Sequence, residues 1–278
     1  MGEIIVGVDG SDSSRAALRW AADAAAAQGV GLRAIAAWQY PAQAATPAGP
    51  VRLPGPDEMD QQTCDSLRGI VREVLGSSAG PVEIEAGRGP ASTVLLGAAA
   101  RSEADMLVVG ARGLGGFSGL LLGSVSQQCV EYSPCPVVVL RDDSGPADGP
   151  IVIGLDGSEG AARALDWTID LADATGVPIV AVHATGLGPN NAMLDAARQS
   201  LEQWCAPIEA RAISYEMRVE HSEARAALEE AADATGASLL VVGTRGLGAV
   251  RGLLLGSVAG YVARYSTRPV AIVPPFTG

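Results

Sequence analysis

Short apolar runs alternate with longer alanine-rich stretches along the chain, and the whole pattern occurs twice. The runs lie at residues 3–8, 31–37, 81–86, 105–110 and 136–140, and again at 151–155, 178–184, 213–219, 238–243 and 269–273. Several are apolar without polar alternation, which is typical of parallel strands covered on both faces. Helical patterns occupy 13–28, 57–77, 90–102 and 123–131, with counterparts at 160–175, 190–211, 223–235 and 256–265.

Five strands that alternate with helices in each half predict an α/β fold. We expect two tandem doubly wound five-stranded parallel sheets, each with the strand order 3-2-1-4-5. In such a sheet the order reverses between strands 1 and 4, and ligands bind beyond the carboxyl ends of the strands at that point. The pattern therefore predicts one ligand crevice in each half.

The internal repeat also predicts the domain boundaries. The run from Ile4 to Ser11 returns from Ile151 to Ser158, and a charged, Pro/Gly-rich decapeptide separates the halves. We assign one domain to residues 1–142, a second to 150–278, and a linker to 143–149. The last strand of each half would be an apolar sheet edge, which invites association. Two arrangements would cover these edges, a pseudo-dimer within the chain or a homodimer with a partner chain.

Composition excludes several classes of partner. The 278 residues carry a formal net charge of −12, which argues against a nucleic-acid groove because such grooves need clustered basic residues. No run approaches the ~18 apolar residues of a membrane span, and no signal-peptide pattern opens the sequence. The four cysteines show no metal-ligand spacing. We therefore expect a cytoplasmic protein with reduced thiols, no bound structural metal and no membrane partner.

The strongest chemical signal is a glycine-rich loop present in both halves. Gly110-Ala-Arg-Gly113, nine residues, then Gly123-Ser124 recurs as Gly243-Thr-Arg-Gly246, nine residues, then Gly256-Ser257. Each copy follows a predicted strand and leads into a helix, so free backbone N–H groups and the positive end of a helix converge on one point. Neither loop contains lysine, so this is no Walker A site. Phosphate is the expected ligand, held by amides and the serine hydroxyl.

Other residues near these loops admit two interpretations. Ser124 could instead be an ordinary N-cap, and Arg112 and Arg245 are either phosphate ligands or solvated surface residues. Asp9 and Asp156 end the first strand of each half. One interpretation is that each aspartate faces nucleotide polar groups or Mg²⁺. The other is that it is a turn residue of an Asp-Gly-Ser sequence. Ala37 and Ala184 end the second strands, where a small side chain would let an adenine ring approach the backbone.

Taken together, these motifs resemble the universal stress protein family in its tandem, actinobacterial form, and the loop pattern resembles that of its ATP-binding branch. The resemblance implies the adenine nucleotide alpha hydrolase-like fold and two ATP sites, with Mg²⁺. The first site would comprise Gly7, Asp9, Ala37, Gly110, Ala111, Arg112, Gly113, Leu114, Gly115, Gly116, Gly123, Ser124, Val125 and Ser126. The second would comprise Gly154, Asp156, Ala184, Gly243, Thr244, Arg245, Gly246, Leu247, Gly248, Ala249, Gly256, Ser257 and Val258. Ala259 stands where the first half has Ser126, so the second site would lack one hydroxyl.

The resemblance implies a nucleotide-dependent regulatory module of the stress response. No catalytic base is placed beside either loop by the sequence, so we expect ATP binding with little or no turnover and name no catalytic residue. The alternatives are a slow ATPase or self-phosphorylating enzyme, and a scaffold that keeps the fold without nucleotide. The sequence identifies no downstream protein partner.

Overall fold

The computed structural model describes residues 2–40, 45–46, 49–50, 53–76, 80–114, 121–141, 148–186, 191–248 and 254–275. The first half contains β1 (Glu3–Gly7), α1 (Asp12–Gln28), β2 (Gly31–Trp38), α2 (Pro56–Leu75), β5 (Val82–Arg88), α3 (Ala91–Ser102), β6 (Met106–Gly110), α4 (Ser124–Tyr132) and β7 (Val137–Leu140). The second contains β8 (Ile151–Gly154), α5 (Glu159–Thr175), β9 (Ile179–Ala184), α6 (Asn191–Ala210), β10 (Tyr215–Glu220), α7 (Ala224–Thr235), β11 (Leu239–Gly243), α8 (Ser257–Tyr265) and β12 (Val270–Val273).

The elements expected from the apolar pattern are all present, with ends that shift by one or two residues. A separate ribbon of β3 (Ala45–Thr46) and β4 (Gly49–Pro50) was not expected, because strands of two residues leave no periodic pattern. The strand order of each half is the expected 3-2-1-4-5, and all neighbours within a half run parallel.

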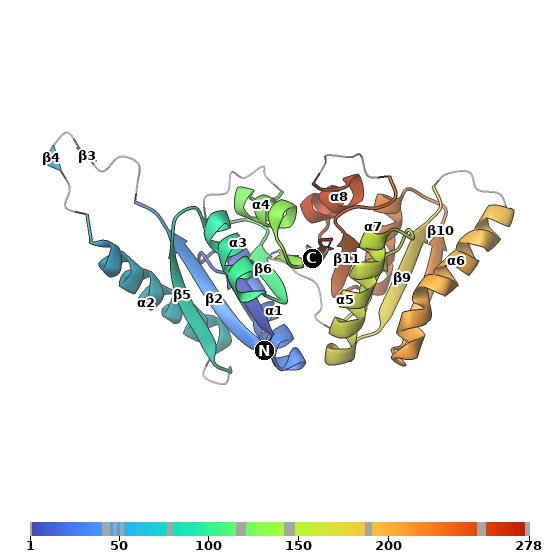
Figure 1. The fold of residues 1–278 in the computed structure, drawn as a ribbon, viewed down its shortest axis with the longest axis horizontal. Helices are drawn as coiled ribbons and strands as arrows, with labels where there is room; N and C mark the ends of the chain where they lie inside the picture. The colour runs from blue at the N-terminus through green and yellow to red at the C-terminus, as the bar shows by residue number, and fades with distance from the viewer. Residues whose placement is uncertain are drawn as a thin grey trace.

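The two five-stranded halves join edge to edge through their last strands, within the chain itself. Strand β12 pairs antiparallel with β7, which gives ten strands in the order β10-β9-β8-β11-β12-β7-β6-β1-β2-β5 (Figure 1). Val270 lies opposite Val139 and Ile272 opposite Val137, and all four side chains are buried. An unpaired strand edge exposes backbone N–H and C=O groups, so this pairing satisfies both edges at once.

Each face of the sheet carries one continuous apolar core that runs through both halves. Helices α1, α2, α5 and α6 cover one face, and α3, α4, α7 and α8 cover the other. Consecutive strand residues alternate between the faces, so Ile4 and Ile5 belong to different cores although both are fully buried. This double cover explains why the strands read as unbroken apolar runs. Helices α1 and α5 also pack against each other where the halves meet.

The helices differ in whether a side chain caps their first turn. Ser11 caps α1 and Ser158 caps α5, each accepting a hydrogen bond from an amide of the first turn. The N-caps of α4 and α8 are Gly123 and Gly256, which have no side chain to accept such a bond. In the described part of the chain, α4 and α8 thus share with α2, α3 and α7 a first turn whose amides no cap side chain satisfies.

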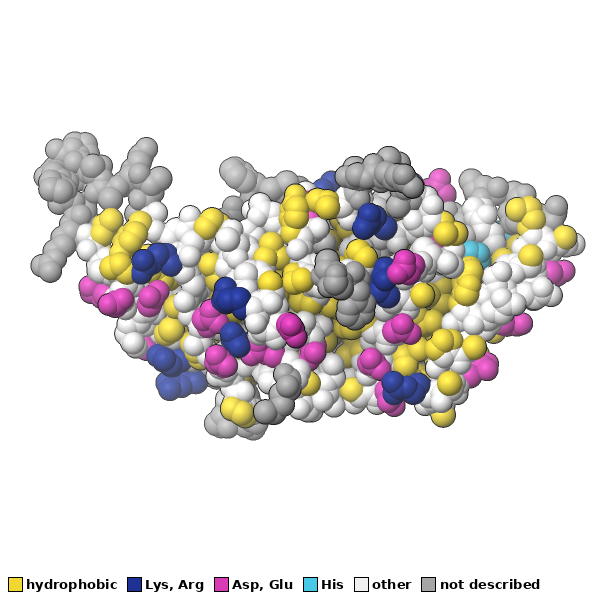
Figure 2. All heavy atoms as spheres, viewed as in Figure 1, with side chains coloured by type: hydrophobic (Ala, Val, Ile, Leu, Met, Phe, Trp, Pro, Cys, Tyr) yellow, Lys and Arg dark blue, Asp and Glu magenta, His cyan; other side chains and the backbone are white. Residues whose placement is uncertain are grey.

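Charged side chains of both signs share the surface. On the face seen in Figure 2, basic side chains are scattered among acidic ones over both halves. None of the helices in the described part is long and apolar enough to cross a bilayer. All four cysteines are unpaired, and three of them are buried.

Candidate functional site: two glycine-loop crevices

Each half has a cavity at the point where its strand order reverses. The first measures about 520 Å³ and lies beyond the carboxyl ends of β1 and β6, and the second measures about 380 Å³ beyond β8 and β11. The described residues that line the first are Gly7, Val8, Asp9, Ser14, Ile35, Ala37, Ala91, Leu95, Val109, Gly110, Arg112, Gly113, Leu114, Gly123, Ser124, Val125 and Ser126. The second is lined by Gly154, Leu155, Asp156, Ser158, Ala161, Val182, Ala184, Ala224, Leu228, Val242, Gly243, Thr244, Arg245, Gly246, Gly248, Leu255, Gly256, Ser257, Val258 and Ala259.

Most residues expected at the two sites therefore surround one cavity in each half. Ala111 does not line the first cavity, because it is buried in the core with 1% of its surface exposed. Leu247 does not line the second, and its side chain is 74% exposed. Gly115, Gly116 and Ala249 lie outside the described residues.

The sequence reasoning missed the apolar wall of each cavity. Leu95 on α3 and Leu228 on α7 face the ends of the first strands, so a Cβ at Gly7 would lie 2.8 Å from Leu95 Cδ1 and one at Gly154 would lie 3.1 Å from Leu228 Cδ2. In the sequence, both leucines occupy positions typical of the buried apolar face of a helix. The strand-end glycines were the available signal, since a strand residue without a side chain marks a close approach by another group.

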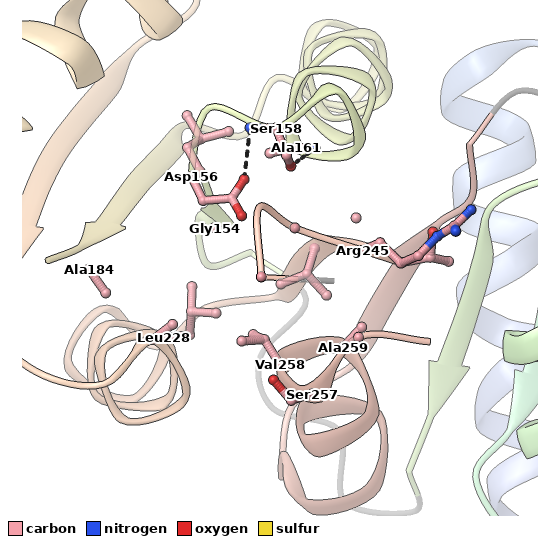
Figure 3. A pocket seen from close by; sticks show the side chains of 18 of the residues that line it. Gly154, Asp156, Ser158, Ala161, Ala184, Leu228, Arg245, Ser257, Val258 and Ala259 are labelled. Atoms are coloured by element: carbon pink, nitrogen blue, oxygen red, sulfur yellow. Dashed lines mark hydrogen bonds between the residues drawn. The ribbon is translucent and has the colours of Figure 1, made fainter. Parts of the chain in front are cut away.

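Asp9 and Asp156 join the two loops that border each cavity. One oxygen of Asp9 accepts hydrogen bonds from the backbone and hydroxyl of Ser11 at 3.0 and 2.6 Å, and the other accepts one from the Leu114 amide at 3.1 Å. Asp156 accepts a 3.0 Å hydrogen bond from the Ser158 amide (Figure 3). Its other oxygen accepts one from the Leu247 amide at 2.9 Å. We call each bridge from the carboxylate to the glycine loop a latch. Each aspartate therefore forms the turn that one interpretation expected, and it also lines the cavity.

The hydrogen bonds of the first latch affect the ionisation of Asp9. Partial burial raises the pKa of this carboxyl, but bonds from Ser11, Leu114 and Ser14 favour the charged form more strongly. The net result is a pKa below the ordinary value for aspartate. The latch therefore contains a carboxylate at neutral pH.

The glycines of the loops are required by the protein's own packing. A Cβ on Gly113 would lie 2.5 Å from Asp9 Oδ2, and one on Gly246 would lie 2.1 Å from Asp156 Oδ2. Both distances are shorter than nonbonded contacts allow, so an alanine would displace the carboxylate. We expected these glycines to admit a ligand, and the structure gives them a further role in admitting the latch.

The first glycine of each loop lets a helix start approach the strand end. A Cβ on Gly110 would lie 2.6 Å from the hydroxyl of Ser13, and one on Gly243 would lie 2.7 Å from the carbonyl oxygen of Gly160. The loop then closes at its base through a 2.7 Å hydrogen bond from the Gly123 amide to Ala111 O. Strand, loop and two helix starts are thus held within a few ångströms of one another.

The serines after the loops are the first residues of helices α4 and α8. Ser124 is not the N-cap that one interpretation expected, because Gly123 occupies that position. Ser257 follows Gly256 in the same way, and the side chains of both serines are exposed at the cavity. Each cavity therefore receives exposed hydroxyls and first-turn amides from a helix without a side-chain cap.

Ser126 and Ala259 differ in their internal contacts. The Ser126 hydroxyl is 3% exposed and donates a 2.6 Å hydrogen bond to Gly110 O. Ala259 is 2% exposed at the corresponding place in α8. The serine hydroxyl is thus already used by the backbone of the strand end.

The loop arginines are exposed. Arg112 and Arg245 contribute to the cavity linings, but Figure 3 shows the Arg245 side chain pointing away from Asp156 and Ala184. The Arg245 guanidinium is therefore directed away from the latch carboxylate of its own half.

A doubly wound α/β sheet with a glycine-loop crevice at the switch point of each half defines a tandem protein of the adenine nucleotide alpha hydrolase-like class. The model of the Universal stress protein family matches residues 1–141 and again residues 149–274. The chain belongs to the universal stress protein family.

Known proteins of similar length agree with this assignment. A universal stress protein of Mycolicibacterium smegmatis is 33% identical over 98% of this chain and 97% of its own, and one of Mycobacterium tuberculosis is 30% identical over 97% and 95%. The crystal structure of a universal stress protein from Archaeoglobus fulgidus aligns with a TM-score of 0.71 at 20% identity and covers 98% of both chains. That last likeness supports the ten-stranded fold.

Proposed function

We propose that each half binds one ATP with Mg²⁺ and that the chain is a cytoplasmic, nucleotide-dependent regulator of the stress response with little or no turnover. The observation that carries this proposal is the duplicated cradle, in which a glycine loop and a helix without a side-chain cap face one cavity at the switch point. Anions bind at such helix starts because unpaired amides and the helix dipole both favour negative charge.

The dimensions and the chemistry of the cavities suit a nucleotide. Volumes of about 520 and 380 Å³ fall in the range usual for small-molecule sites. The lining of the first cavity combines the apolar Leu95 and Ile35 and the small Ala37 with the glycine loop and Ser124 at the start of α4. A planar base would pack against the apolar side chains, and phosphates would use the amides and the hydroxyl.

Magnesium would enter with the phosphates. The described residues contain no cluster of three side chains able to hold a metal ion, so phosphate oxygens and water would supply most ligands. Asp9 and Asp156 are the carboxylates at the two cavities. Each would bind the ion through a carboxylate lone pair that the loop amide leaves unused, so that the latch stays closed.

Regulation would follow from the loops. A ligand shifts a conformational equilibrium only as far as it binds one state better than another. Phosphate contacts to Ser124 and its neighbours would favour the closed loop, in which Asp9 holds the Leu114 amide. The ordered loop would then be the state that a downstream protein distinguishes.

The test is a direct measurement of nucleotide binding. We expect native mass spectrometry of the purified chain to reveal bound adenine nucleotide, and calorimetry of nucleotide-free protein to give two ATP sites that depend on Mg²⁺. Gly113→Ala should weaken the first site and Gly246→Ala the second. ADP, AMP and cAMP serve as competing ligands. Correctly folded protein that binds none of them would refute the proposal.

Phosphate release separates this function from an enzyme. We expect less than one turnover per site over several hours, because the carboxylates at the cavities are engaged by loop amides. Multiple turnovers that disappear in both glycine variants would favour a slow ATPase. Stable phosphate on the chain would favour self-phosphorylation.

A further inference from the structure

Arg141, the first residue after β7, bridges the two halves through carbonyl oxygens. Its Nη1 donates a 2.8 Å hydrogen bond to Leu121 O, and its Nη2 donates bonds of 3.0 and 2.9 Å to the oxygens of Ala263 and Arg264. Leu121 lies two residues before the N-cap of α4, whereas the other two belong to the last turn of α8. One guanidinium therefore contacts segments of both halves.

Both segments lead to a crevice. Leu121 O is two residues from Gly123, whose amide closes the first glycine loop and which lines the first cavity. Helix α8 begins at the second cavity, where Ser257 and Val258 form part of the lining. The helix has nine residues, so its ends are about 13 Å apart at the ordinary rise. Figure 1 shows α4 and α8 on either side of the middle of the molecule, where β7 meets β12.

The charge of Arg141 suits this position. The last carbonyls of a helix lack intrahelical partners and carry partial negative charge, which a cation stabilises. A ligand phosphate would stabilise the opposite end of α8. The guanidinium and the phosphate would therefore act on the same helix from its two ends.

The corresponding position of the second half holds no arginine. Leu140 pairs with Gly110 and Val273 with Gly243, so Pro274 follows β12 where Arg141 follows β7. Proline has no side-chain donor. The bridge is therefore asymmetric, although the fold that carries it is repeated.

We propose that Arg141 couples the two nucleotide sites, so that occupancy of the first crevice raises the affinity of the second; this inference rests on the proposed function. A ligand that fixes the first glycine loop fixes Leu121 O and holds the guanidinium over the end of α8. The helix then loses less freedom when phosphate binds at its start, and the second site binds more tightly. By linkage, occupancy of the second site raises the affinity of the first by the same factor.

A cycle of variants measures the coupling. ATP with Mg²⁺ is titrated by calorimetry into the intact chain and into Gly113→Ala, which weakens the first site, each with and without Arg141→Gln. We expect the second site to bind about tenfold more weakly in Gly113→Ala than in the intact chain. In the Arg141→Gln background this difference should vanish. Arg211→Gln is the matched control, because Arg211 pairs with Asp170 and Asp173 on the surface and none of the three lines either cavity.

Hydrogen exchange gives a readout that does not depend on the arginine variant folding. In Gly246→Ala, which weakens the second site, ATP at a concentration that fills the first site alone should slow the exchange of amides at the end of α8, such as that of the C-cap Ser266, which donates to Val262 O. If Arg141 had a purely structural role, ATP at the first site would leave this exchange rate unchanged.

The outcomes separate this inference from the proposed function. Two sites that fill independently in the intact chain, coupling that persists in Arg141→Gln, or an end of α8 that ignores ATP would each overturn the coupling and leave nucleotide binding intact. Binding at one site alone would also overturn it. A chain that binds no nucleotide would remove both proposals together.

Discussion

Replacing Gly246 with alanine should open the latch of the second half. The new Cβ would lie 2.1 Å from Asp156 Oδ2, which no relaxed structure permits, and the atom it meets belongs to a short side chain fixed at its other oxygen by the Ser158 amide. The carboxylate must therefore turn away. Its 2.9 Å hydrogen bond from the Leu247 amide is then lost.

The size of the effect follows from that one bond. A hydrogen bond to a charged acceptor contributes about 1.5–3 kcal/mol when shielded from water. Asp156 is half-buried and Leu247 is exposed, so solvent screening reduces the expected loss to about 1 kcal/mol. Loop opening should become about fivefold more populated, since 1.4 kcal/mol corresponds to tenfold, and the melting temperature should fall by about 2–4 °C.

Hydrogen exchange at the Leu247 amide measures the latch directly, in the nucleotide-free protein. We expect faster exchange in Gly246→Ala and nearly unchanged exchange in Gly248→Ala, because a Cβ on Gly248 meets no atom within 4 Å. Unchanged exchange in Gly246→Ala, or equal acceleration in both variants, would refute the reasoning.

Three further predictions concern charge, an internal hydroxyl and the joined sheet. Folding lowers the pKa of Asp9 from its ordinary value of 3.8. The stability that the charged carboxylate contributes is therefore fully present above pH 3.8 and is lost as the pH falls through the lower pKa of the folded state. Asp9→Asn should thus lose less stability than the parent between about pH 5 and about pH 3, measured by urea unfolding; equal losses would contradict this. Ser126→Ala should cost about 1 kcal/mol by removing the bond to Gly110 O, and a neutral result in thermal unfolding would contradict it. Val138→Ala should cost about 2 kcal/mol, because Val138 is fully buried opposite Ala271. If Val138→Ala unfolds at the same denaturant concentration as the parent, the packing between β7 and β12 contributes little to stability.

The local pattern predicted the elements and their order well. Unbroken apolar strands, alanine-rich helices and repeated glycine loops are short-range features, so they can be read without knowledge of distant contacts. The same pattern located Asp9, Ala37 and Gly113 at one cavity, because the connection rules of parallel sheets bring the ends of strands 1, 2 and 4 together.

Contacts between distant segments decided the rest. The Leu114 amide that Asp9 binds is 105 residues away, and the carbonyls that Arg141 binds are 122 and 123 residues away. No periodicity records such pairs. The choice of Gly123 over Ser124 as N-cap likewise depended on how the loop closes against Ala111.

The sequence by itself thus determined the doubly wound halves and the two glycine loops, since these depend on local propensity and on general rules of strand connection. Only the tertiary structure decided that β7 and β12 join both halves in one sheet and that Arg141 spans them. In each half, the backbone groups of the last strand and of the helix ends could find hydrogen-bond partners in more than one way. The packing energy of the whole chain selects one of these arrangements.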